Sequence, residues 1–255
     1  FCNQRRYVNT VITGQDDAEV LDAIQSMVAN AQADGFILLY SKKDCPVAAY
    51  LRNEGLLHVI VGKAAQSANQ TIYIDNDNAL AGEEAADYLY EMGHRRIAYM
   101  IGYENNDGNG REAAFRKAME EFGLPLEPEL MMQGLFNEKV AYNNVRVLIG
   151  RQERLPDAIV CASDEMAIGC MNAIHDMGME VPGDVSVLGF DNLAIGEMCE
   201  PKLTTVDYDI SRFCRMAVEE LLRLIADPTQ EGSIQYTATR LIIRNSVALR
   251  LGRLK

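Results

Sequence analysis

Short apolar runs alternate along this chain with longer segments whose apolar residues recur every three or four positions. The runs Gly35 to Tyr40 and Leu57 to Gly62 are apolar on both faces, like strands buried within a parallel sheet. The stripe Ala81, Ala85 and Leu89 is typical of one face of a helix. This alternation predicts βαβ units, with right-handed crossovers and parallel sheets covered by helices on both faces. The sequence therefore predicts a doubly wound α/β protein.

The expected elements run from a capping box at Asp16 to an apolar strand that ends at Phe190. Gly93 and Gly123 follow two of the helical segments, where glycine is the usual terminating residue. Helices are expected at 16–31, from 46, and at 81–92, 114–122, 140–149 and 164–177, and strands at 35–40, 57–62, 97–101, 131–132, 158–161 and 185–190. Ligands of such sheets bind beyond the carboxyl ends of the strands, so the residues just after each strand are the most informative.

The composition limits the size and the environment of the protein. With 255 residues, 48% of them hydrophobic, the chain can bury two small cores or one large α/β core, and disorder is excluded. No apolar run reaches the roughly eighteen residues that a membrane span requires. The charged stretch Phe1 to Arg6 is not followed by the apolar region of a signal peptide. We therefore expect a cytoplasmic protein with no membrane partner.

Net charge and cysteine spacing limit the partners. The formal net charge of −13 argues against nucleic-acid binding by these residues, because phosphates are neutralised by clustered Lys and Arg. The densest basic cluster, Arg5-Arg6, is too small for this role. Six cysteines form no CxxC pair and have no histidine at metal-ligand spacing; they are Cys2, Cys45, Cys161, Cys170, Cys199 and Cys214. We expect buried, reduced thiols and no metal site.

Motifs for cofactor binding and catalysis are missing from the sequence. The nearest stretch to a dinucleotide-binding GxGxxG, Gly102 to Gly110, has the wrong spacing and acidic residues where a phosphate would approach. Neither a P-loop nor a GxSxG nucleophile elbow occurs. The histidines His58, His94 and His175 have no nucleophile beside them in sequence. The chain is therefore expected to have no catalytic residues, to bind no cofactor and not to be an enzyme.

Three groups of segments, in this order, resemble the LacI/GalR family of bacterial transcriptional regulators. Residues 75–78 (DNDN), with 93–98 (GHRRIA) after an intervening helix, are similar to the family segment "DN…GHRRIA". Residues 181–192 (VPGDVSVLGFDN) resemble "VP-DVSV-GFD". Residues 201–206 (PKLTTV) and 241–246 (LIIRNS) resemble "P-LTTV" and "L-I-R-S". The resemblance covers almost the whole chain. Within the family, Val61-Gly62-Lys63 together with residues 75–78 favours the maltose-operon repressors.

The resemblance implies two flavodoxin-like subdomains, similar to type I periplasmic binding proteins, with parallel sheets and three crossover strands. The crossovers would fall near residues 75–78, 206–208 and 234–236. An N-terminal subdomain is then expected at 1–75 plus 207–234, and a C-terminal subdomain at 76–206 plus 235–255. The family's DNA-binding headpiece is not found in the sequence. The first strand of the family's N-terminal subdomain is not found either, and the absence of this strand would leave a sheet edge exposed.

The resemblance also implies two principal ligand contacts. Asp191, at the end of a strand, matches the aspartate that accepts sugar hydroxyls. Arg111 matches the arginine of "R-x-x-G-F", although Ala114 replaces the glycine of that motif and alters the expected helix packing. Structural alternatives stay open for both residues. Asp191 could cap a turn, and Arg111 could pair with a surface carboxylate.

Four further positions are weaker candidates for ligand contact. Phe136 stands where many family members keep an aromatic residue beside the ligand, but it could equally be a core residue. Ser163 stands where the family usually has Asn, so its hydrogen bond would be shorter or pass through water. The next residue, Asp164, is expected to cap its own helix rather than to contact a sugar. Lys63 and Tyr103 follow strands without a motif, and a solvated or partly buried role is open for each.

Together these features imply the effector-binding and dimerisation domain of a LacI-type repressor. The sequence favours maltose or a related sugar, whose hydroxyls Arg and carboxylate groups would bind in forks while an aromatic ring covers the sugar face. Two-fold operator symmetry implies a homodimer that reads operator DNA through a headpiece outside these residues. A secreted sugar-binding protein would share the fold, and an α/β enzyme is the remote alternative. A nucleobase effector also stays open.

Overall fold

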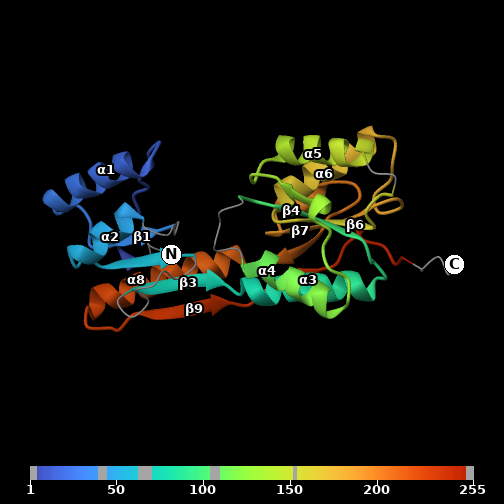
Figure 1. The fold of residues 1–255 in the computed structure, drawn as a ribbon. Coiled ribbons are helices and arrows are strands. Elements are labelled where there is room, and N and C mark those ends of the chain that lie inside the picture. Colours follow the sequence, from blue (N-terminus) through green and yellow to red (C-terminus); the bar gives the residue numbers. More distant parts are fainter. Residues whose placement is uncertain (1–4, 40–44, 63–70, 104–109, 152–153, 251–255) are drawn as a thin grey trace. The chain divides into compact units, whose positions relative to one another are not determined.

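The structure is a computed structural model that describes residues 5–39, 45–62, 71–103, 110–151 and 154–250 (Figure 1). The chain divides into two compact units. Unit 1 comprises Phe1–Asn76 and Asp209–Ala238, and unit 2 comprises Asp77–Tyr208 and Thr239–Lys255. The chain therefore passes from one unit to the other three times, and each unit is assembled from separate stretches of sequence around its own sheet.

Unit 1 contains a four-stranded parallel sheet in the order β1-β2-β3-β9. Its strands are β1 (Phe36–Leu38), β2 (His58–Val61), β3 (Ile72–Asn76) and β9 (Ser233–Thr237), and its helices are α1 (Asp17–Ala29), α2 (Pro46–Asn53) and α8 (Ile210–Ala226). The Asp16 carboxylate accepts the N–H groups of Ala18 and Glu19 at the start of α1, as its place in a capping box predicts. Strands β3 and β9 pair from Ile72 opposite Ser233 onwards.

Both faces of the unit 1 sheet are buried because adjacent strand residues point to opposite sides. Ile60 of β2 belongs to a core cluster with Ile24 of α1 and Leu51 of α2. Its neighbour Val59 belongs to a separate cluster with Leu224 of α8. Helices therefore cover both faces of this sheet, which explains why its strands read as continuous apolar runs.

Unit 2 contains a six-stranded sheet in the order β10-β8-β7-β6-β4-β5, parallel except for the edge strand β10. The strands are β4 (Ile97–Ile101), β5 (Met131–Gln133), β6 (Ala158–Cys161), β7 (Ser186–Phe190), β8 (Thr204–Asp207) and β10 (Arg240–Ile242). The helices are α3 (Asn78–Glu91), α4 (Gly110–Glu121), α5 (Glu138–Arg151), α6 (Asp164–Asp176) and α7 (Ala194–Met198), with a 3-10 turn at Pro128–Leu130. Within this unit, α3 and α4 lie on one face of the sheet and α5 and α6 on the other (Figure 1).

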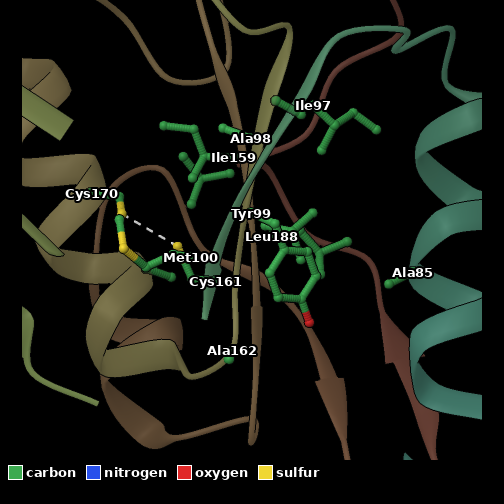
Figure 2. Close-up of a cluster of buried hydrophobic side chains, with 14 of the residues drawn as sticks. Ala85, Ile97, Ala98, Tyr99, Met100, Ile159, Cys161, Ala162, Cys170 and Leu188 are labelled. Carbon is green, nitrogen blue, oxygen red and sulfur yellow. Dashed lines mark hydrogen bonds between the residues drawn. The ribbon is translucent and has the colours of Figure 1, made fainter. Parts of the chain in front are cut away.

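The largest core of the described residues lies in unit 2, and Figure 2 shows part of it. Tyr99 of β4 packs its ring against Phe115 of α4, with the ring centroids 5.2 Å apart. The next residue, Met100, lies on the side of α6, where the thiols of Cys161 and Cys170 are 3.3 Å apart (Figure 2). Because β4 is buried on both faces, its sequence is again a continuous apolar run. The two sheets and their covering helices confirm the predicted α/β fold with parallel sheets.

The cysteine prediction needs one correction. Cys45, Cys161 and Cys170 are buried free thiols, as expected, and Cys199 is partly buried. Cys214 is exposed instead, because it lies on the outward face of α8. Cys2 lies outside the described residues. Among the helices that the structure describes, none is both long and apolar enough to span a membrane.

A glycine lies at a close backbone contact in each of two helix pairs of unit 2, α3 with α4 and α5 with α6. A Cβ on Gly82 of α3 would lie 2.1 Å from the carbonyl oxygen of Arg111, in the first turn of α4. A Cβ on Gly169 of α6 would lie 2.2 Å from the carbonyl oxygen of Glu138, the first residue of α5. Neither contact leaves room for a side chain. Gly82 therefore sets how closely the turn that carries Arg111 approaches α3.

Gly82→Ala is expected to destabilise the protein, because its methyl group would overlap the Arg111 carbonyl. Overpacking of this kind costs about 1–3 kcal/mol of unfolding free energy. Gly150→Ala in α5 is the matched control, since a Cβ there meets nothing within 4 Å, and alanine is favoured over glycine within a helix by about 0.5–1 kcal/mol. Urea unfolding should give changes of opposite sign, and equal losses in both variants would contradict the contact.

Candidate functional site

The carboxyl ends of the parallel strands of unit 2 lie at one edge of its sheet. Tyr103 follows β4, Ser163 follows β6 and Asp191 follows β7. Arg111 reaches the same edge from α4, where one terminal nitrogen of its guanidinium donates to the carbonyl oxygen of Ala162 at 2.9 Å. Ala162 is the residue directly after β6. This edge is the candidate functional site.

The guanidinium of Arg111 is held by neutral groups. Its Nε and one terminal nitrogen both donate to Oδ1 of Asn78, at 3.1 and 3.0 Å. Its central carbon lies 4.8 Å from the ring centroid of Phe190 and 4.9 Å from that of Tyr208, within range of cation–π attraction. Among the described residues no carboxylate forms an ion pair with it. With the Ala162 contact, these bonds use three of the five guanidinium N–H groups, so two have no partner in the part of the chain that the structure describes.

Asp191 directly follows β7 in an uncommon backbone conformation. The φ angles of Asp191 and Asn192 are 109° and 52°, in the left-handed region that residues other than glycine seldom adopt. Such residues are found preferentially at functional sites. The peptide N–H of Asp191 donates to the carbonyl oxygen of Val206 on β8 at 2.9 Å. Its carboxylate accepts no hydrogen bond from the described part of the chain, and is therefore available to a ligand.

Two carboxyl groups at this edge have raised pKa values. Burial raises the pKa of Asp191 to about 7; the positive charge of Arg111 acts in the opposite direction, and the negative charges of Asp164 and Glu165 add to the increase. Burial also raises the pKa of Asp164 to about 6, against two hydrogen bonds and the charge of Arg244. Perturbed carboxyl groups of this kind gather at functional sites.

Ser163 and Asp164 stand at the start of α6 in different roles. Ser163 is the N-cap, and its buried Oγ accepts the N–H of Met166 at 3.3 Å. Asp164 was expected to cap this helix, but its two carboxylate oxygens instead accept the N–H of Leu193 at 2.7 Å and the hydroxyl of Thr205 at 2.6 Å. The prediction was wrong by one residue, because Ser163 already supplies the capping oxygen. A ligand contact by the Ser163 hydroxyl would compete with that cap.

Phe136 and Tyr103 form an aromatic pair beyond the ends of β5 and β4. Their rings meet edge to face, with centroids 5.6 Å apart, and their side chains are 36% and 58% exposed. Phe136 is therefore not a core residue. The ring lies directly against Gly102, where a Cβ would come within 2.1 Å of it. Phe136 also lines a depression of about 500 Å³ together with Glu165 and Leu193.

Several residues that shape this edge were not predicted as site residues. Asn78 and Tyr208 contact Arg111, and Thr205 contacts Asp164. Arg244 donates to Oδ1 of Asn192 at 2.7 Å. The Tyr208 ring is 3% exposed, and its hydroxyl has no hydrogen-bond partner within the described residues. Asn78, Thr205 and Arg244 all belong to the family-like segments, so those motifs were the signal available for finding them.

Two further predictions concern Lys63 and the absence of a metal site. Lys63, a predicted ligand contact, lies outside the described residues. A metal site was not expected from the sequence. Over the described ranges, no group of three His, Cys, Asp or Glu side chains could hold a metal ion. Among the described residues, the groups at this edge that could contact a ligand are hydrogen-bonding groups, the Arg111 guanidinium, the Asp191 carboxyl group and aromatic rings.

Comparison with known proteins gives consistent matches. A family model described as a periplasmic binding protein-like domain matches residues 86–247. Among curated proteins, the HTH-type transcriptional repressor PurR of Erwinia tasmaniensis is 32% identical over 252 residues, which covers 97% of this chain and 73% of the repressor. The PurR repressor of Proteus mirabilis is 31% identical over the same length.

Solved structures of transcriptional regulators share the fold. A putative LacI transcriptional regulator from Bacillus cereus subsp. cytotoxis has a TM-score of 0.92 and 27% identity, over 98% of this chain and 89% of the regulator. The transcriptional regulator CelR, solved as a complex with cellobiose, has a TM-score of 0.86 and 28% identity, over 96% of this chain and 75% of CelR. These relatives are transcriptional regulators, which confirms the prediction that the chain is not an enzyme.

The raised pKa of Asp191 predicts how stability depends on pH. A carboxyl group whose pKa is higher in the folded than in the unfolded protein binds its proton more tightly when folded. Its contribution to the unfolding free energy is fully present below its unfolded pKa of 3.8 and is lost as the pH rises through about 7. We expect the stability of the wild type, relative to Asp191→Asn, to fall across this window by about 2 kcal/mol, with allowance for partial exposure.

Guanidinium unfolding of both proteins at several pH values between about 4.5 and 8 measures this difference. Asp164, whose pKa is also raised, is present in both proteins, so its own contribution largely cancels. Two stability curves that run parallel across the range would contradict the assignment of the raised pKa to Asp191.

Proposed function

Because the chain belongs to the LacI/GalR family of transcriptional regulators, as an effector-binding domain, we propose that it binds a sugar effector through Arg111 and Asp191. The observation that carries this proposal is the presence, at one edge of one sheet, of a cation and a carboxyl group with free hydrogen-bonding capacity. Within the described residues, two guanidinium N–H groups of Arg111 have no hydrogen-bond partner, and Asp191 accepts no hydrogen bond.

The chemistry of these groups suits a sugar. Vicinal hydroxyls present donors and acceptors at a spacing that planar guanidinium and carboxyl groups match in a fork. The exposed rings of Phe136 and Tyr103 offer apolar surface for the face of a sugar ring. Ser163 and Lys63 remain weaker candidates for additional contacts. Free hydrogen-bonding groups beside aromatic rings thus favour a polyhydroxylated ring as the effector.

Maltose is the first candidate among sugars, because of the segments at 61–63 and 75–78. The cellobiose bound by the related regulator CelR supports a disaccharide as the ligand class. A nucleobase is the second candidate, because its planar ring could also lie on Phe136 and its polar edge could meet Arg111 and Asp191. A thermal-shift screen with maltose, cellobiose, ribose and hypoxanthine separates these classes, since a ligand at a hundred times its Kd adds about 2.7 kcal/mol.

The regulator would act in the cytoplasm by coupling effector binding to operator affinity. Such couplings are typically about 1–3 kcal/mol, enough to change operator occupancy. Operator DNA would be bound by a headpiece outside these residues, since a net charge of −13 does not suit phosphate contacts. A secreted sugar-binding protein would share the fold, but the regulator relatives named above favour control of transcription.

We also propose a homodimer formed through unit 2. Its exposed surface carries several large apolar side chains close to the depression lined by Phe136, Leu193 and Ile195. Leu135, Ile195 and Met198 are 39%, 44% and 83% exposed. Apolar patches of this kind mark interaction surfaces. A second copy of the chain is the natural partner, because two-fold symmetric repressors place two headpieces on two operator half-sites.

Arg111→Ala and Asp191→Asn are expected to weaken binding of the sugar identified in the screen by ten- to a hundredfold. Each removes one partner of a charged hydrogen bond, a loss of about 1.5–3 kcal/mol. Arg111→Ala should have the larger effect, because it removes the whole fork. Arg116→Ala, one turn further along α4, and Asp176→Asn are matched controls at exposed ion-pairing and hydrogen-bonding positions. Isothermal calorimetry that finds wild-type affinity in both site variants would place the effector elsewhere.

Met198→Glu is expected to dissociate the dimer, because it places a charge within the apolar patch. Val147→Glu is the control, since Val147 is also exposed, at 48%, but belongs to α5 and not to α7, which carries Ile195 and Met198. Sedimentation velocity at about ten micromolar reports the mass directly. A wild-type protein that sediments only as a monomer, or a Met198→Glu variant that stays dimeric, would rule out this interface.

A further inference from the structure

The carboxylate of Asp164 is buried at the centre of a hydrogen-bond network that does not belong to its own helix. Asp164 is 0% exposed, and its two oxygens accept the N–H of Leu193 and the hydroxyl of Thr205. These partners are 29 and 41 residues away along the chain. A residue that only stabilised α6 would accept from the first turn of α6, and Ser163 already does so. The carboxylate therefore connects the start of α6 to the segment after β7 and to β8.

The segment after β7 is the turn that carries Asp191. Both Asp191 and Asn192 adopt positive φ; the φ of 52° at Asn192 is in the part of the left-handed region that Asn tolerates, whereas the φ of 109° at Asp191 lies outside that part and is strained. Such a turn persists only when its surroundings hold it. Leu193, which donates its N–H to Asp164, is the first residue after these two residues of positive φ. The bond to Asp164 thus lies at the point where the turn would otherwise relax.

Other residues around the carboxylate are consistent with a built site. A Cβ on Gly189 of β7 would lie 2.3 Å from Oδ1 of Asp164, so glycine leaves the space that the carboxylate occupies. Thr205 also receives the N–H of Asn192 on its hydroxyl oxygen at 3.3 Å. Arg244 donates a hydrogen bond to the side chain of Asn192, and its positive charge acts on Asp164. The turn is therefore held at residues 191, 192 and 193 by groups from α6, from β8 and from the segment after β10.

We propose that Asp164 is a positioning residue of the effector site, whose carboxylate holds the Asp191–Asn192 turn in the conformation that presents Asp191 to the ligand. This proposal rests on the proposed function in so far as Asp191 contacts the effector. The structural part of the proposal, that Asp164 holds the turn, does not depend on the proposed function. One measurement therefore tests the conformation of the turn, and a second tests effector binding.

Asp164→Asn tests the hold on the turn. The amide has the size of the carboxylate but only one acceptor oxygen, so one of the two donors, Leu193 N–H or Thr205 hydroxyl, would face an NH₂ group. Asp157→Asn is the matched control. Asp157 is also a buried aspartate, 8% exposed, and it also accepts two backbone N–H groups, those of Arg95 and Arg96 at 3.0 Å. It differs in position, because Asp157 directly precedes β6 whereas Asp164 lies beyond the other end of β6.

Hydrogen exchange of the unliganded 255-residue chain at pH 7.5 provides the first measurement. In Asp164→Asn, amide exchange of residues 191–195 should accelerate at least tenfold, whereas Asp157→Asn should leave this segment unchanged. Thr205→Val should accelerate the same segment, and Thr205→Ser, which keeps the hydroxyl, should restore wild-type protection. If Asp164→Asn only lowered the global stability, the loss of exchange protection would extend over the whole of unit 2 and would also appear in Asp157→Asn.

Calorimetry with maltose, and with cellobiose as the second probe, provides the second measurement. Asp164→Asn should weaken binding about tenfold or more, with Asp157→Asn and Thr205→Ser at wild-type affinity. Unchanged exchange at residues 191–195 in Asp164→Asn overturns the inference, whatever the ligand. Loss of binding in Asp191→Asn with full binding in Asp164→Asn overturns it too, while leaving the proposed function standing. Accelerated exchange without any effect of Asp191→Asn on binding overturns the proposed site, and with it the role of Asp164 in that site.

Discussion

The close approach of α3 and α4 at Gly82 is the constraint on which the rest of the site depends. Because no side chain separates the two backbones there, the first turn of α4 lies directly on α3. That approach brings the Arg111 side chain within reach of Asn78 at the start of α3 and of the Ala162 carbonyl after β6. A larger residue at position 82 would move the guanidinium away from both oxygens. A cation in a mostly apolar unit is thus placed by a backbone contact rather than by an opposite charge.

The electrostatics of the site follow from this choice of partners. Arg111 is surrounded by amide and carbonyl oxygens and by two rings, none of which neutralises its charge. Asp191 is close enough for its pKa to respond to that charge, but burial has the larger effect. An ion pair between them would have satisfied both groups and left little for a ligand to gain. Keeping the two charges apart preserves their capacity for hydrogen bonds to hydroxyls.

The sequence was sufficient for the fold and for part of the site. Buried parallel strands produce apolar runs that need no tertiary information to recognise, so strands such as β4 and β7 were predicted close to their observed bounds. The position of Asp191 at the end of a strand was predictable because it follows such a run. Tyr208 was not, because its contact with Arg111 joins residues almost a hundred positions apart. The role of Asp164 was predicted wrongly for a related reason. The local sequence shows that a helix begins there, but it does not show that the Thr205 hydroxyl, on the distant strand β8, donates a hydrogen bond to Asp164.

The three passages of the chain between its units have a consequence for how the protein is made on the ribosome. The sheet of unit 1 receives β9 and one of its covering helices, α8, from residues that follow nearly all of unit 2. Val59 and Ile74 therefore emerge without Ala217 and Leu224, which complete their core cluster. At typical translation rates, that interval lasts about ten seconds. Throughout it, unit 1 is a half-covered sheet that chaperones can bind, and it is completed only after residues 210–237 have been synthesised.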